Sequence, residues 1–116
     1  MRALGARLSP EARVRYAHVH AVDADRARIV VVPVLTPGVA AMTLDRWILV
    51  RTGHESDVGL LAHELVHVEQ WRTHGVVGFL RAYLGDYVRG RRAGLDHWAA
   101  YRAIPFEAEA RLRTGQ

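Results

Sequence analysis

Residues 60–71 read LLAHELVHVEQW and place His63, Glu64 and His67 in the pattern H-E-x-x-H. Residues four apart lie on one face of an α-helix, so the two imidazoles can face one metal ion. Glu64 lies about 100° further round the helix, within reach of a water on that ion. Zinc lowers the pKa of its water to about 7, and a neighbouring carboxylate can take the proton and pass it to a leaving amine. The stretch therefore predicts a zinc-binding helix with Glu64 as the general base.

The residues around this pattern predict that its helix is buried. Leucine and valine fill most of the other positions of residues 60–68. Two imidazoles and a carboxylate are costly to bury without partners, and a zinc ion would be such a partner. The alternative is that His63 and His67 are satisfied by hydrogen bonds in the core or reach the surface.

A catalytic zinc site usually has three protein ligands and one water, so a third ligand must come from elsewhere in the chain. The chain has no cysteine, which leaves His, Asp or Glu. His97 is one candidate. The segment PFEAEAR, residues 105–111, offers Glu107 and Glu109 on a short expected helix downstream. These two glutamates cannot easily share the role, because residues two apart on a helix point to different sides.

The first half of the chain predicts strands. The segment RYAHVHAVD, residues 15–23, alternates and would place His18 and His20 on one strand face. This spacing can bind a metal, although histidines exposed on a strand are more common. The segment RARIVVVPVL, residues 26–35, is continuous and β-branched, as a buried strand would be, and Pro33 marks its limit.

A turn signal around Pro37 and Gly38 separates these strands from an expected hairpin. The hairpin covers residues 41–53 and bends at Asp45 and Arg46. Strands are thus expected over about 15–52, as a small N-terminal antiparallel sheet.

The second half predicts helices. Ser56 or Asp57 can cap a helix over about 57–73, and Gly75 ends it. Three further helices are expected, over residues 77–92, 95–103 and 105–113. Gly90 and Gly94 are expected to be helix stops, and Pro105 is expected to be the first residue of the last helix. With helices over about 57–114, residues 1–116 are expected to form one α+β domain, a sheet followed by a helical half.

The motif LLAHELVHVEQW together with YRAIPFEAEA, residues 101–110, resembles the gluzincin branch of the zincin-type zinc metallopeptidases. Over residues 40–110 the layout is also similar to small bacterial zincin-like domains of unknown function. In the gluzincin branch a second helix supplies a glutamate from the pattern E-x-x-x-D. In this chain the glutamate of the pattern corresponds to Glu107, and Arg111 stands in the place of the aspartate.

The resemblance implies a minimal zincin-like fold, zinc as the cofactor and peptide hydrolysis as the activity. It implies His63, His67 and Glu107 as metal ligands and Glu64 as the catalytic base, with Glu109 as the alternative ligand. The aspartate of the pattern would orient a zinc-bound histidine. Arg111 cannot do so, and another residue would have to take that role.

Other residues have a structural and a functional interpretation. Tyr101 could donate a hydrogen bond to a tetrahedral intermediate or could be a core aromatic beside Trp98. Glu69 and Gln70 follow the second histidine and are expected at the surface or as supports of the ligands. Trp47 begins the segment WILVR, and by resemblance a strand beside the zinc site can pair with an extended substrate; the alternative is simple packing in the core.

Charge and length restrict the partners. The chain has 116 residues, a net charge of +4 and sixteen basic residues, all arginine. Arginine suits phosphate recognition, and the group Arg89, Arg91 and Arg92 could contact nucleic acid. Because the arginines are interleaved with acids and this group ends an expected helix, a solvated helix end is favoured and nucleic acid is an unlikely partner.

The N-terminal residues have no apolar core of signal-peptide length, and no apolar run approaches the roughly 18 residues of a membrane span. We therefore expect a cytoplasmic protein whose partner is a peptide or protein substrate. Because 116 residues leave little wall for a cleft, the alternative is a zincin-fold module that binds zinc and acts through a protein partner without turnover.

Overall fold

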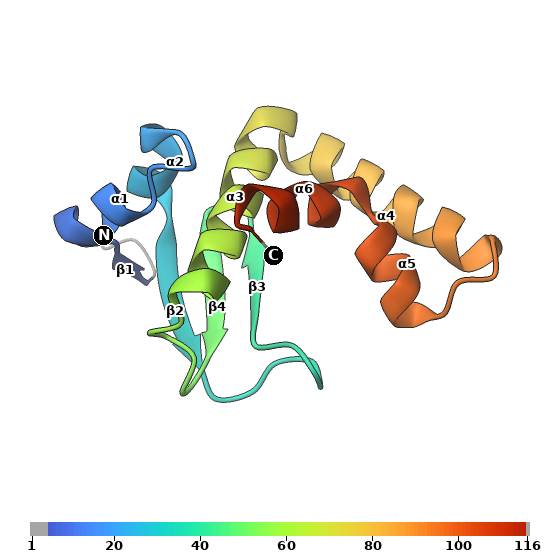
Figure 1. The fold of residues 1–116 in the computed structure, drawn as a ribbon, viewed down its shortest axis with the longest axis horizontal. Coiled ribbons are helices and arrows are strands. Elements are labelled where there is room, and N and C mark those ends of the chain that lie inside the picture. Colours follow the sequence, from blue (N-terminus) through green and yellow to red (C-terminus); the bar gives the residue numbers. More distant parts are fainter. Residues whose placement is uncertain (1–4, 116) are drawn as a thin grey trace.

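The computed structural model describes residues 5–115 and confirms the α+β class, with a small sheet followed by helices (Figure 1). In chain order the elements are β1 (Ala6–Arg7), α1 (Pro10–Arg15), α2 (Ala21–Arg26), β2 (Arg28–Val32), β3 (Ala41–Leu44), β4 (Trp47–Arg51), α3 (Val58–His74), α4 (Val76–Arg92), α5 (His97–Ala103) and α6 (Pro105–Arg113).

The sheet is mixed, and the expectation of an antiparallel sheet is wrong for one strand pair. The strand order is β1-β2-β4-β3. The β3–β4 hairpin is antiparallel as predicted, and Asp45 takes the left-handed conformation at its bend, with φ 55°. However, β4 returns between β3 and β2 and runs parallel to β2. Ile48 and Val50 of β4 are fully buried, which explains why this apolar strand lies inside the sheet.

The strand expected at residues 15–23 is absent, and this prediction is wrong. The chain instead leaves α1 and enters α2, which His20 caps by accepting from the backbone N–H of Val22 (3.2 Å). The carboxylate of Asp23, fully buried, receives two hydrogen bonds from Arg72 of α3 (2.6 and 2.9 Å). This charge pair and the burial of Tyr16 favour helical turns over a strand. The segment is so short that the alternation of apolar and polar residues does not determine its secondary structure.

The helix carrying the H-E-x-x-H pattern has the predicted limits within a residue. Asp57 caps α3 by accepting from the backbone N–H of Leu60 (3.0 Å), and Gly75 ends it with φ 75°. Leu65, Val66 and Val68 of α3 are fully buried against the sheet and the N-terminal segment. The limits of α3 are therefore set by its cap and by Gly75, and its position by the packing of its apolar side chains in the core.

The last three helices also form where the sequence predicts them. Pro105 opens α6, whereas α4 runs through Gly90 to Arg92, so the stop expected at Gly90 is wrong. A Cβ atom at Gly90 would lie 3.1 Å from the Cβ atom of Ala100. The glycine thus allows α5 to pack closely against α4 instead of ending the helix.

Helices α4 and α5 extend from the rest of the molecule as a helical arm, defined here as residues 76–104 (Figure 1). An aromatic stack fixes its base: Phe79 of α4 lies between Trp71 of α3 (ring centroids 4.2 Å apart) and Phe106 of α6 (4.8 Å). Within residues 5–115, no helix is both long enough and apolar enough to cross a membrane.

Candidate metal centre and cleft

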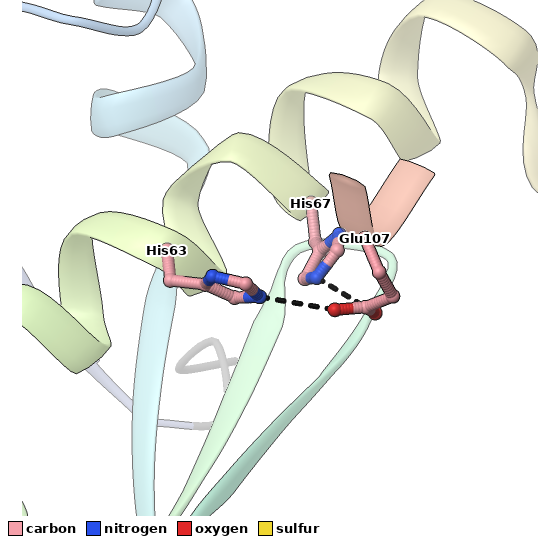
Figure 2. A group of neighbouring side chains, drawn as sticks. All are labelled: His63, His67 and Glu107. Carbon is pink, nitrogen blue, oxygen red and sulfur yellow. Dashed lines mark hydrogen bonds and ion pairs between the residues drawn. The ribbon is translucent and has the colours of Figure 1, made fainter. Parts of the chain in front are cut away.

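Helices α3 and α6 bring the three predicted ligands together (Figure 2). One carboxylate oxygen of Glu107 lies 3.0 Å from His63 Nε2, and the other lies 3.0 Å from His67 Nε2. One ligand atom from each residue lies within 4.8 Å of the others. The side chains are only 12%, 6% and 3% exposed for His63, His67 and Glu107. This buried group could hold a metal ion.

The hydrogen bonding of the group fits a metal ion. His67 Nε2 is buried and has no aligned hydrogen-bond partner among residues 5–115, although Glu107 Oε2 is close. A buried polar atom without such a partner is costly in a protein interior. Imidazole nitrogens and a carboxylate oxygen converging on one point are ligands that divalent transition metals accept.

Burial and charge set the protonation of these groups. Burial raises the pKa of Glu107, but the contacts of its carboxylate with His63 and His67 outweigh burial and hold this pKa far below its usual range. Burial lowers the pKa of His67, but contact with the Glu107 carboxylate outweighs it and raises the pKa to about 9. Without a metal ion, the site at neutral pH therefore pairs a Glu107 carboxylate with a protonated His67.

A metal ion must then displace a proton from His67, and binding is expected to release about one proton per chain at pH 7. Because the pKa of His67 is raised to about 9, affinity should increase as the pH rises from 7 towards that value. Calorimetric titration with Zn²⁺ in two buffers of different ionisation enthalpy measures the released protons. Equal heats in both buffers would contradict this prediction.

Glu64 lies beside the metal group but is not part of it. Its carboxylate accepts a hydrogen bond from the hydroxyl of Thr43 in β3 (3.1 Å), and the residue is 5% exposed. Burial raises the pKa of Glu64, although the charges of His67 and His63 oppose the shift. A buried carboxylate with a raised pKa beside a metal group is suited to accept a proton.

Two tyrosines contact the site from the helical arm. The hydroxyl of Tyr83 donates to Glu107 Oε2 (2.8 Å), a contact that local sequence patterns do not show because it joins two different helices. Burial and the charge of Glu107 raise the pKa of both Tyr83 and Tyr101. Tyr101 also packs edge-on against Trp98 (ring centroids 6.0 Å apart), so both interpretations of this residue keep support.

A cleft of about 320 Å³ opens beside Glu64, His67 and Glu107, between β3 and the helical arm. Its lining is mainly apolar and aromatic and includes Met42, Leu44, Trp71, Phe79, Leu80, Leu84, Trp98 and Tyr101. Pockets of this size are large enough for a small-molecule or side-chain ligand.

The strand that could pair with an extended ligand is β3. Trp47 begins β4, which is hydrogen-bonded on both sides, to β2 and to β3. The expectation that this strand pairs with substrate is therefore wrong. Among residues 5–115, the edge strand of the sheet beside the cleft is β3, which carries Thr43.

The alternative ligands lie outside the metal group. Glu109 accepts from the side-chain amide of Gln70 (2.6 Å). His97 pairs with the hydroxyl of Tyr87 (2.9 Å) on the helical arm. Neither residue belongs to the group of three that the geometry brings together among residues 5–115.

The remaining candidates have structural partners. His18 contacts the backbone oxygen of Ala62 (2.9 Å) while His20 caps α2, so these two do not form a shared site. Glu69 pairs with Arg113. Arg111, in the place of the expected aspartate, donates to the backbone oxygen of Arg102 in the preceding helix.

Gln70 contacts the second histidine, His67, at the ring nitrogen that does not face Glu107. It is 3% exposed, and its Oε1 atom lies 2.7 Å from His67 Nδ1. The sequence pattern alone did not separate this role from a surface position.

Compared with known proteins, the chain matches no family model, no curated protein sequence and no solved structure.

Proposed function

We propose that this protein is a zinc-dependent peptidase. The observation that carries the proposal is the convergence of His63, His67 and Glu107 beside an apolar cleft that Glu64, His67 and Glu107 line. Two imidazoles and one carboxylate, with a position left for water, are a donor set of catalytic zinc sites.

Zinc held by these ligands would lower the pKa of a bound water to about 7 and polarise a substrate carbonyl. Glu64 would accept a proton from water and pass it to the leaving amine. Its raised pKa favours uptake of the proton, and the hydrogen bond from Thr43 holds the carboxylate in place. The contact with Thr43 also links the base to β3, the strand at the edge of the cleft.

Tyr101 is assigned as the donor to the oxygen that becomes negatively charged during attack. It lines the cleft, and burial together with the charge of Glu107 raises its pKa and so keeps its hydroxyl protonated. Tyr83 instead binds Glu107 directly and holds the third ligand in position.

The cleft suggests the class of substrate. An extended peptide can pair its backbone with the free edge of β3. The apolar lining favours a large apolar side chain next to the bond that is cleaved, and a charged side chain would lose its hydration there.

A Leu80→Ser variant tests this preference. Leu80 lines the cleft, so its loss is expected to lower kcat/KM about tenfold for peptides with a large apolar side chain and to change little for peptides with alanine at that position. Leu112→Ser is the matched control, because Leu112 is 80% exposed and lies outside the cleft. An equal decrease for both peptide classes would contradict the preference.

The alternative function is a zinc-binding module that holds a partner segment without cleaving it. The exposed apolar side chains of Trp98 and Leu84, 49% and 57% exposed at the cleft, favour this alternative. A screen of peptide libraries with zinc-loaded protein, read by mass spectrometry, separates the two functions. Cleavage that a chelator abolishes supports the peptidase, and binding without cleavage supports the module.

A further inference from the structure

A chain of hydrogen bonds links the second histidine to α6 through one side chain. Gln70 Oε1 lies 2.7 Å from His67 Nδ1. The amide nitrogen of Gln70 donates to the backbone oxygen of Phe106 (3.0 Å) and to the carboxylate of Glu109 (2.6 Å). Gln70 is 3% exposed, so bulk water contributes little to its hydrogen bonding.

The partners on α6 determine which way the amide faces. A backbone carbonyl can only accept a hydrogen bond, and an ionised carboxylate can also only accept. If the amide of Gln70 were reversed, its oxygen would face these two acceptors and no donor. The amide nitrogen therefore faces Phe106 and Glu109, and the amide oxygen faces His67.

The direction of the amide in turn determines the tautomer of His67. Because Gln70 presents an acceptor, His67 Nδ1 must carry a proton and donate it. The other ring nitrogen, Nε2, is the one that faces Glu107. A neutral His67 thus has its free electron pair on the nitrogen that faces the metal group.

We propose that Gln70 is a positioning residue that fixes His67 as an Nε2 ligand with a protonated Nδ1. In this arrangement α6 contributes twice: Glu107 is a ligand, and Phe106 and Glu109 fix the amide that orients the other ligand. In the pattern E-x-x-x-D the aspartate would orient a ligand histidine, but this chain has Arg111 at that position. Gln70 takes the orienting role instead. The proposal concerns metal binding and holds whether or not the protein cleaves peptides.

The first test is the zinc affinity of a Gln70→Met variant, which keeps a side chain of similar length but removes the acceptor. Partners of this kind typically contribute about 10–100-fold to metal affinity, and the variant is expected to bind Zn²⁺ more weakly by that factor. Competition with a chromophoric chelator measures the change. Glu69→Gln is the matched control, since Glu69 is the neighbouring polar residue of α3 and pairs with Arg113 instead of His67.

A double variant tests rescue. In Gln70→Glu/Glu109→Gln the carboxylate at position 70 still accepts from His67 Nδ1 and receives a donor from the amide at position 109, while the backbone oxygen of Phe106 loses the donor that Gln70 supplies. This variant is expected to bind Zn²⁺ within about tenfold of the native chain. A role of Gln70 in packing alone predicts no advantage of this variant over Gln70→Met.

The tautomer can be read in the native chain without any substitution. A long-range ¹H–¹⁵N correlation spectrum of the zinc-loaded protein is expected to show His67 with a proton on Nδ1 and the metal on Nε2. Coordination through Nδ1, or a folded Gln70→Met variant with native affinity, would overturn the proposal. If Gln70→Met does not fold, the spectrum of the native chain decides.

Discussion

A Glu64→Gln variant is expected to bind zinc as the native chain does and to cleave peptides about 10²–10⁴-fold more slowly, the usual contribution of a general base. Glutamine has the size of glutamate, and its amide oxygen can still accept from Thr43. It cannot take a proton from water. Because Glu64 is outside the ligand group, zinc content should not change.

The measurement is kcat on the best peptide from the library, together with zinc per chain in the same sample. Glu69→Gln serves as the control here too, because Glu69 lies on the same helix and pairs with Arg113. Cleavage by Glu64→Gln at the native rate would remove Glu64 from the mechanism. Cleavage by neither the native chain nor the variant would favour the zinc-binding module.

The second large effect is expected on zinc affinity, when one of the metal ligands is removed. Removal of one ligand, in His63→Ala or Glu107→Gln, leaves a divalent ion with two protein donors. A hydrogen-bond partner of a metal ligand contributes about 10–100-fold to metal affinity, and the loss of a ligand should cost more than that. Both variants are therefore expected to contain no zinc after purification. Glutamine at position 107 can still accept from Tyr83, which limits the damage to the surrounding hydrogen bonds.

Zinc per chain, measured by mass spectrometry of protein purified without added metal, decides this prediction. His97→Ala is the control, since His97 pairs with Tyr87 and lies outside the metal group. Retention of zinc by Glu107→Gln together with its loss in His97→Ala would assign the third ligand to His97.

The two histidines of the metal group could be predicted from sequence because their spacing is local. His63 and His67 are four apart on a helix that Asp57 caps, and α6 begins at a proline. Each of these signals acts within one or two helical turns. The resemblance supplied Glu107, and the structure places it between the two histidines.

The sheet and the supporting residues depend on contacts between distant segments. The sequence predicts the β3–β4 hairpin through its bend, but no local signal shows that β4 returns between β3 and β2. The alternation of residues 15–23 is equally local and misleading, because the buried pair of Asp23 with Arg72 joins segments far apart in sequence. Tyr83 and Gln70 likewise show their roles only when α6 packs beside them.

The helical arm of residues 76–104 leaves α3 shortly after His67 and returns to α6 just before Glu107. Both of its ends are therefore tied to the metal group and to the stack around Phe79. The tip at residues 93–96 is far from the ligands in sequence and exposed, so its length can vary without moving them. Because one wall of the cleft belongs to this arm, a new arm on the same base would give the same metal chemistry a different selectivity.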